Sequence, residues 1–374
     1  MLSAAFVIWT TRPYNHPSMT VTVRSFAKIN LGLRIGAARE DGFHELLTVY
    51  QTIALHDVIR VSVARGSGIE IRCEDARVPR DESNTCYKIV ERAVRALSAK
   101  GRVVVEIEKR LPVQGGMGGA SSNAVATLIA LERALKRSLP PAERLRIASE
   151  VGSDLPLFLV GGTVLGVGRG EQVYPLPDFP TMPLVVVTPE IGVSTPRAFA
   201  EWDRRQGLKP PSRSGSNAEA NDCSAAERRS DRDLGPAVSP QDKPELTVSG
   251  GSDRMNELSR GLSAWLSEPY SSAPVVGRGR AENPLLWLVR AGIENDFEQV
   301  VFPEYPELCE GKRALVRAGA KYASLSGSGS TLYGLFTSKD AAARAAVRLK
   351  KEGWAAQATV TLNRTAYWKR MLAG

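Results

Sequence analysis

The segment of the chain best suited to chemistry is a glycine-rich run, Leu111-Pro-Val-Gln-Gly-Gly-Met-Gly-Gly-Ala-Ser-Ser122. It follows a short apolar stretch, Val103 to Ile107, that predicts a strand, and it leads into helical periodicity from Ser122 to Lys136. Glycines let backbone N–H groups turn toward a ligand, and a helix start adds unpaired donors and partial positive charge. The run therefore predicts an anion-binding loop, with phosphate as the natural anion.

This loop differs from two common phosphate-binding patterns. It does not close on Gly-Lys-Ser/Thr, and it lacks the third glycine of a dinucleotide fingerprint. Its hydroxyls are paired instead, as Ser121 and Ser122 at the expected helix start. Taken alone, the loop also fits a flexible turn followed by a serine helix cap.

Isolated polar residues elsewhere could supply the chemistry. Asp154 lies between a glycine and an apolar run, where a carboxylate can act as a general base or can cap a short helix. Alternation from Val21 to Ile35 predicts a strand with Lys28 and Asn30 on one non-core face, although such a lysine is normally just solvated. A second turn, Ser326-Gly-Ser-Gly-Ser330, either helps to enclose a ligand or simply connects two strands.

Composition sets the broad class. The chain has 374 residues, 43% hydrophobic and 24% charged, which fits a globular enzyme of two domains. Its net charge of +9 fits a nucleic acid, a membrane surface or an anionic small substrate. Because the basic residues are scattered and do not cluster with aromatic ones, we expect no nucleic-acid partner.

The ends of the chain and its cysteines bear on location. The apolar run from Leu2 to Trp9 is too short to span a bilayer, so we expect no membrane segment and a disordered tail over 1–18, with Met19 as an alternative start. The four cysteines and three histidines are too dispersed for a disulfide scaffold or a zinc site, which favours the cytoplasm and leaves any metal ligands unknown.

Strand and helix patterns mix along the chain and predict an α+β fold. A stretch at about 204–280, poor in apolar residues, predicts a disordered insertion. The expected strands are Val21–Ile35, Thr48–Val63, Val103–Ile107, Leu184–Thr188, Tyr322–Leu325, Leu332–Phe336 and Ala358–Leu362; the expected helices are Thr85–Lys100, Ser122–Lys136, Pro141–Val151, Met255–Leu266, Leu285–Ala291, Tyr305–Ala318 and Lys339–Lys351.

The motifs in their order along the chain resemble those of the GHMP kinases, the superfamily of galactokinase, homoserine kinase, mevalonate kinase and phosphomevalonate kinase. The segments that carry this resemblance are Ser25-Phe-Ala-Lys-Ile-Asn-Leu31, the loop at 112–122, Gly152-Ser-Asp-Leu-Pro156 and Ser326-Gly-Ser-Gly-Ser330. The resemblance implies a ribosomal-S5-like ATP-binding domain at 19–180 and a ferredoxin-like α/β sandwich domain at 181–374.

Further segments resemble one branch of the superfamily, whose members phosphorylate the 2-hydroxyl of a cytidine-diphospho methylerythritol in the non-mevalonate pathway. They are Arg39-Glu-Asp-Gly-Phe-His44, Leu47-Thr-Val-Tyr-Gln51, Lys109-Arg-Leu-Pro112, Thr195-Pro-Arg-Ala-Phe199 and Glu294-Asn-Asp-Phe-Glu298. A kinase for homoserine or a mevalonate-like alcohol is the main alternative, and Gly42-Phe-His44 favours a base-recognising pocket instead.

The resemblance also implies roles for individual residues. Asp154 would accept or orient the proton of the substrate hydroxyl, and Lys28 would stabilise the negative charge that develops on that oxygen, with ATP and Mg²⁺ as cofactors and a monomer or homodimer as the assembly. The implied ATP-binding residues are Asn84, Lys109, Pro112, Val113, Gln114, Gly115, Gly116, Met117, Gly118, Gly119, Ala120, Ser121 and Ser122; the implied substrate-binding residues are Asn30, Phe43, His44, Thr195 and Phe199.

The chain departs from the pattern of this branch at three places. Ala120 stands in place of a loop glycine, Ser153 in place of alanine, and Phe43 in place of a tyrosine. Phe43 keeps a ring that can stack on a base but has no hydroxyl.

Overall fold

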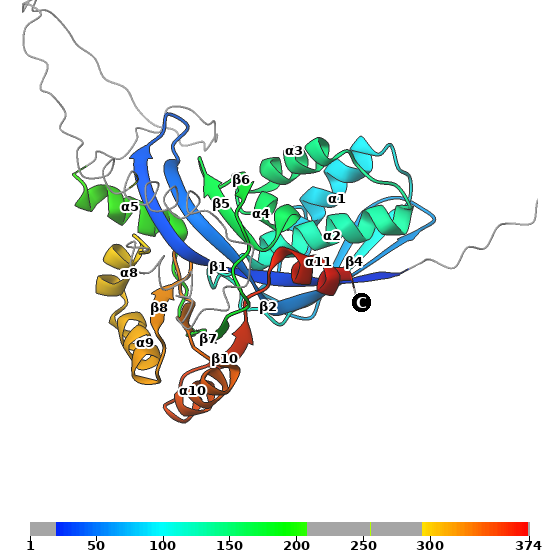
Figure 1. Ribbon diagram of the computed structural model, residues 1–374. Helices are drawn as coiled ribbons and strands as arrows, with labels where there is room; N and C mark the ends of the chain where they lie inside the picture. The colour runs from blue at the N-terminus through cyan, green and yellow to red at the C-terminus, as the bar shows by residue number, and fades with distance from the viewer. Residues whose placement is uncertain (1–19, 208–254, 256–293, 373–374) are drawn as a thin grey trace, which may run out of the picture.

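Two long antiparallel strands, β1 (Val21–Ala38) and β2 (His44–Ala64), run through the centre of the protein. The computed structural model describes residues 20–207, Met255 and 294–372. In Figure 1 the two strands, in blue, separate a group of helices on one side from a second sheet on the other. Both units of the fold therefore meet on this hairpin.

The first unit is a six-stranded sheet covered by helices. Its order is β3 (Ile69–Cys73), β4 (Arg102–Glu108), β2, β5 (Thr163–Val167) and β6 (Gln172–Pro175), with β1 paired to β2. The helices are α1 (Thr85–Ala96), α2 (Gly119–Leu135), α3 (Pro141–Val151) and α4 (Leu155–Val160). Buried aliphatic side chains of α1, α2 and the sheet form one continuous core.

The second unit is an antiparallel four-stranded sheet in the order β10 (Ala356–Val360), β7 (Pro183–Val187), β9 (Leu332–Leu335) and β8 (Tyr322–Leu325). Its helices are α5 (Thr195–Arg205), α8 (Glu298–Glu304), α9 (Pro306–Arg317) and α10 (Lys339–Lys351). The last helix, α11 (Arg364–Leu372), returns to the first unit, where the buried Tyr367 hydroxyl donates to the Phe158 carbonyl at 2.7 Å.

The α+β class is confirmed, and most of the expected elements are present. The predicted division near residue 180 falls between β6 and β7 and stays a prediction. Among the described residues, no helix is both long and apolar enough to cross a membrane.

Some sequence predictions were wrong in detail. Helix α2 begins at Gly119 rather than Ser122, and β10 is two residues earlier than expected. The helices α5, α8 and α11 and the strands β3, β5 and β6 were not predicted. Five of the six are short, whereas α5 has eleven residues, with Ala198 and Trp202 buried at helical spacing, and could have been predicted.

Helix α5 continues to Arg205, so the first residues of the insertion expected at about 204–280 are helical. The rest of the insertion, the tail at 1–18 and the helix expected at 285–291 lie outside the described residues, as does the helix expected at 255–266 apart from Met255.

The strand that carries Lys28 and Asn30 differs most from expectation. Both side chains lie on one side of β1, as predicted, but they are 3% and 1% exposed rather than solvated. Strand β1 is covered on both faces because the two units pack against it, so alternation along the strand could not distinguish a core face from an outer face.

Candidate active site

A buried lysine and a partly exposed aspartate meet above the central hairpin. The Nζ of Lys28 donates to Asn30 Oδ1 at 2.7 Å and lies 3.4 Å from Asp154 Oδ2. The hairpin register places Lys28 opposite Thr52 and Asn30 opposite Tyr50. The Tyr50 hydroxyl in turn donates to Asp154 Oδ1 at 3.1 Å. One ammonium and one phenol therefore hold the carboxylate.

Asp154 is the N-cap residue of α4 by position, as one interpretation of the sequence expected. Within the described part of the chain its side chain accepts no bond from the first turn of that helix, so the carboxylate is available for other contacts. The carboxylate is 33% exposed, whereas the Lys28 side chain is 4% exposed. This geometry leaves the carboxylate reachable by a ligand and keeps the ammonium behind it.

Tyr50 lies in the Leu47–Gln51 motif, but the sequence predicted no role for it. Burial, followed by the charge of Asp154, raises the pKa of the Tyr50 phenol well above its ordinary value. The phenol therefore remains protonated at neutral pH and acts as a donor. Its hairpin register with Asn30 is the signal that could have identified it.

Asn30 is itself fixed by the surrounding backbone and side chains. Its Nδ2 donates to Thr48 Oγ1 at 2.8 Å, and Thr48 donates onward to the Gly32 carbonyl at 2.7 Å. The buried Tyr333 hydroxyl donates to the Asn30 carbonyl at 2.8 Å. Because these groups are buried and paired, Lys28 has a preorganised position.

The glycine loop lies directly against this lysine. The Lys28 N–H donates to the Met117 carbonyl at 3.0 Å. Gly118 has a φ of 66°, and a Cβ there would lie 2.9 Å from Phe158 Cζ and 3.2 Å from Lys28 Cγ. Glycine is therefore required both for the backbone conformation and for the close approach.

The turn at Ser326–Ser330 packs onto the same loop. The Thr331 N–H donates to the Gly115 carbonyl at 3.1 Å, and Ser326 Oγ donates to the Gly116 carbonyl at 3.0 Å. This turn connects β8 to β9, and it also forms a wall of the site. The two units thus meet where their glycine-rich turns touch.

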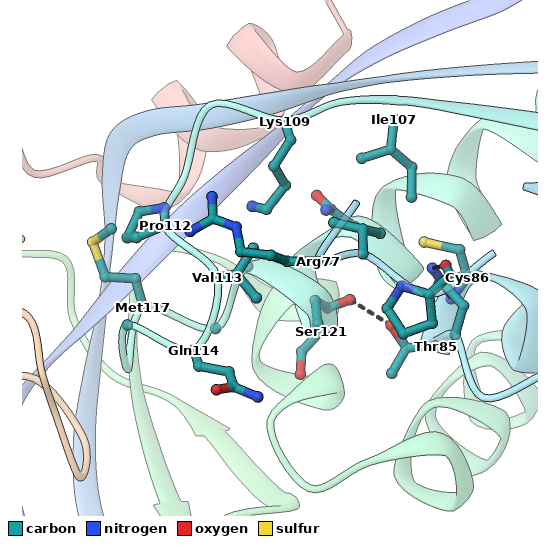
Figure 2. Close-up of a pocket in the computed structure, with 18 of the residues that line it drawn as sticks. Arg77, Thr85, Cys86, Ile107, Lys109, Pro112, Val113, Gln114, Met117 and Ser121 are labelled. Carbon is teal, nitrogen blue, oxygen red and sulfur yellow. Dashed lines mark hydrogen bonds between the residues drawn. The ribbon is translucent and has the colours of Figure 1, made fainter. Parts of the chain in front are cut away.

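A cavity of about 380 Å³ opens beside the glycine loop, within the size range of small-ligand sites. Figure 2 shows the loop residues from Pro112 to Met117 along one side, with Lys109 and Arg77 extending toward the interior. The cavity is lined by Asn84, Lys109 and every loop residue from Pro112 to Ser121. Twelve of the thirteen predicted ATP-binding residues are therefore together: those ten loop residues plus the other two.

Ser122 is the exception among them. Its buried hydroxyl donates to the Phe26 carbonyl at 2.6 Å and accepts from Ser25 Oγ at 2.8 Å. Since α2 begins three residues earlier, Ser122 lies inside the helix and faces β1. It anchors the helix, and the serine-cap interpretation of the loop is wrong.

The sequence did not reveal the opposite wall of the cavity. Apolar atoms there come from Val78, Pro79, Cys86 and Ile107, which suits the flat face of a base. Burial raises the pKa of the Cys86 thiol to about 12, so this thiol stays protonated and serves as an apolar surface.

Asn84 shapes the same wall. Its Oδ1 accepts from the Cys86 N–H at 2.8 Å, which caps α1, and its Nδ2 donates to the Pro79 carbonyl at 2.6 Å. Both ends of the amide are engaged by the protein, so Asn84 fixes the course of the chain around the cavity.

A second group of predicted residues gathers between the hairpin and α5. His44 Nε2 lies 2.6 Å from Asp203 Oδ1, and its ring stacks on Phe199 at a centroid distance of 4.9 Å. Phe43 is 50% exposed, and the Arg169 guanidinium lies 4.9 Å from its ring centroid. Asp203 was not predicted, because the helix that carries it was not recognised.

The two groups of residues are linked through the glycine loop. A hollow beside Thr195 is lined by Gln114 and Gly116, which also line the first cavity. Thr195 Oγ1 and Ser328 Oγ lie 2.7 Å apart and close one side of it. The loop therefore separates two spaces that share its backbone.

Comparisons with known proteins agree with this architecture. The family described as GHMP kinases N terminal domain matches residues 84–162, and GHMP kinases C terminal matches residues 285–355. A crystal structure of homoserine kinase from Cytophaga hutchinsonii superposes with a TM-score of 0.62 at 18% identity, covering 94% of this chain and 98% of that one, and supports the fold alone. The fold and the glycine loop thus define a GHMP kinase.

Relatives within that class are more specific. A 4-diphosphocytidyl-2-C-methyl-D-erythritol kinase of Solibacter usitatus is 36% identical over 94% of this chain and 92% of its own length. One of Rhodococcus jostii is 33% identical over 89% of each chain. A crystal structure of 4-(cytidine 5'-diphospho)-2C-methyl-D-erythritol kinase has a TM-score of 0.61 at 27% identity, covering 91% of this chain and 99% of that one.

The chain therefore belongs to the 4-diphosphocytidyl-2-C-methyl-D-erythritol kinase family, ATP-dependent kinases of the non-mevalonate pathway of isoprenoid synthesis.

Proposed function

We propose that the protein transfers the γ-phosphoryl group of ATP to the 2-hydroxyl of 4-diphosphocytidyl-2-C-methyl-D-erythritol. The observation that carries this proposal is the Lys28–Asp154 pair, with its Nζ to Oδ2 distance of 3.4 Å, directly behind the glycine loop. Family membership supports the choice of reaction.

In this proposal Asp154 accepts or orients the proton of the attacking hydroxyl. Its exposed fraction of 33% allows contact with an alcohol, and the bond from Tyr50 leaves Oδ2 on the side of Lys28. The Lys28 ammonium stabilises the negative charge that develops on the attacking oxygen. Positioning and electrostatics carry phosphoryl transfer, so a rigid pair of this kind suffices for the protein's part.

We place ATP in the cavity beside the glycine loop. The apolar wall at Val78, Pro79 and Ile107 offers a surface for adenine, and the start of α2 offers N–H groups and partial positive charge for the phosphates. Asn84 and Lys109 complete this proposed ATP site together with the loop residues at 112–121.

Mg²⁺ belongs to the same proposal. Among the described residues no group of three or more His, Cys, Asp or Glu side chains is arranged to hold a metal. Mg²⁺ does not require such a group, because it is held mainly by substrate phosphates, water and one or two protein oxygens. Ser121, which lines the cavity, supplies the protein oxygen proposed for this role, and the ion would neutralise phosphate charge.

We place the cytidine end of the acceptor near Phe43, His44 and Phe199, and its reacting end near Asn30. Phe43 offers an exposed ring face, and the Asp203 carboxylate fixes the orientation of the imidazole. Thr195 lies between these residues and the glycine loop, where a diphosphate would bridge the two regions.

The assembly and location remain part of the proposal. Residues of a single chain line both cavities, which supports a catalytically competent monomer or a homodimer with independent sites. Cys73, Cys86 and Cys309 are free thiols, which supports a cytoplasmic location.

Purified protein tests the assignment directly. Transfer of ³²P from labelled ATP is measured with the cytidine-diphospho alcohol, homoserine and phosphomevalonate in parallel. We expect turnover with the first acceptor only. Turnover with homoserine or phosphomevalonate alone would overturn the assignment and leave the class intact.

A further inference from the structure

A fully buried carboxylate lies beneath the glycine loop and has no part in the chemistry proposed above. Asp57, in β2, is 0% exposed. Its Oδ1 accepts from the backbone N–H groups of Arg110 at 2.6 Å and Leu111 at 2.7 Å. Its Oδ2 accepts from Lys109 Nζ at 2.6 Å and Asn123 Nδ2 at 2.9 Å.

These four donors come from both ends of the glycine loop. Arg110 and Leu111 lead into the loop from β4, and Asn123 follows it in the first turns of α2. A single side chain on the central hairpin therefore joins the entry and the exit of the loop. Loss of this carboxylate would free both ends at once.

The carboxylate also sets the position of a charge in the nucleotide cavity. Lys109 lines that cavity, and its ammonium lies 3.3 Å from where a Cβ on Gly119 would stand, at the positive end of α2. A cation beside a helix N-terminus is unfavourable unless an anion offsets it. Asp57 supplies that anion from within the protein, through its bond to the Lys109 ammonium.

A buried carboxylate is costly unless its oxygens are fully hydrogen-bonded. Four donors of suitable geometry meet this requirement, so the cluster is rigid. Rigid placement of a phosphate-binding loop before the ligand arrives reduces the ordering cost of binding.

We infer that Asp57 is a positioning residue for the nucleotide, which acts by joining the two ends of the glycine loop and by holding Lys109 at the cavity wall. This inference rests on the proposed placement of ATP in that cavity. It predicts that substitution of Asp57 weakens the binding of the nucleotide and leaves the binding of the acceptor alcohol unchanged.

Asp57→Asn is the direct test, because it keeps the shape of the side chain and one acceptor oxygen. The amide would present N–H groups to Lys109 and Asn123, which are themselves donors. We expect the KM for ATP to rise by about 30-fold, equivalent to about 2 kcal/mol of lost binding, with the KM for the alcohol within about twofold of wild type. Calorimetric titration with ADP should show the same loss without any acceptor present.

Glu132→Gln is the matched control. Glu132 is a buried carboxylate near the far end of α2, where Oε1 accepts from the Leu139 N–H at 2.7 Å and from Arg144 Nε at 2.9 Å. Its loss should lower the melting temperature and leave both KM values unchanged. The contrast separates general destabilisation of α2 from a local effect on the loop.

Asn123→Ala supplies a second variant without a buried unpaired charge. It removes the bond at the loop exit, from a side chain that also lines the cavity, and we expect a rise of about 5-fold in the KM for ATP alone, also seen with ADP by calorimetry. If Asp57→Asn does not fold, unchanged ADP affinity in this variant overturns the inference.

Two outcomes would overturn the inference: equal rises in the two KM values, or unchanged ADP affinity in the folded variants. Because ADP binding needs no acceptor, these outcomes are distinguishable from failure of the proposed acceptor assignment.

Discussion

The proposed nucleotide cavity and the proposed acceptor region are built by opposite means. The cavity takes ten consecutive residues, Pro112 to Ser121, and much of what it offers a ligand is backbone. The acceptor region instead collects single side chains from distant parts of the chain, such as Lys28, Tyr50, Asp154 and Asp203.

This difference matches the chemistry of the two proposed ligands. A polyphosphate is an extended anion, which a run of N–H groups at a helix start can bind without particular side chains. A hydroxyl to be activated needs one base and one cation in fixed positions. We therefore expect substitutions in the cavity to act through backbone geometry, and those in the acceptor region through the loss of a single group.

Loss of the proposed base should produce the largest effect. Asp154→Ala should reduce kcat by about 10³-fold, because no other described side chain replaces the carboxylate beside Lys28. The dissociation constant for ADP, measured by calorimetry, should remain within about threefold of wild type. A variant that retained most of its turnover would show that the base lies elsewhere.

A methyl group at the point where the two regions touch should affect both. Gly118→Ala adds a Cβ that would lie 2.9 Å from Phe158 Cζ and 3.2 Å from Lys28 Cγ, at a φ of 66°. Displacement of the loop and of Lys28 should reduce kcat/KM for ATP by about 10²-fold in steady-state assays.

Gly353→Ala is the control for this substitution. Gly353 also has a positive φ, 91°, but no described atom would come within 4 Å of a Cβ there. It should cost about 1–2 kcal/mol of unfolding free energy and leave the kinetics unchanged. Equal kinetic losses in both variants would contradict the close-approach argument.

The imidazole of the acceptor region should matter for one substrate only. His44→Ala should raise the KM for the cytidine-bearing alcohol by about 10-fold, as expected for the loss of about one hydrogen bond, and leave the KM for ATP unchanged. His44→Gln, which can still donate to Asp203, separates substrate contact from stability. An increase in the KM for ATP alone would show that the cytidine base does not bind near His44.

The smallest effect should come from the phenol behind the base. Tyr50→Phe removes the 3.1 Å bond to Asp154, and kcat should fall by about 5-fold because the carboxylate loses one of its two anchors. Tyr367→Phe removes an equally buried hydroxyl that donates to Phe158, and it should lower the melting temperature alone. If the two variants had the same kinetics, Tyr50 would have only a structural role.

The structure brings the residues of the proposed nucleotide site together largely as the sequence predicted, and those of the proposed acceptor site only in part. The glycine loop is contiguous, so its composition and its place between a strand and a helix were enough to predict an anion-binding role. Lys28 and Asp154 emerged from the order of motifs, whereas Tyr50, Asp57 and Asp203 did not. Each of these three acts through a partner between 52 and 159 residues away, as in the Asp57–Lys109, Tyr50–Asp154 and His44–Asp203 pairs.

By itself, the sequence determined the α+β class, the glycine-rich loop ahead of a helix and the family to which the chain belongs. Backbone conformation and helix starts are local properties, and residue type and spacing encode them directly. Only the tertiary structure decided that Lys28 is buried, that Ser122 anchors a helix, and that Asp57 joins the two ends of the loop. Burial and hydrogen-bond partners depend on which segments pack together, and no local pattern specifies that.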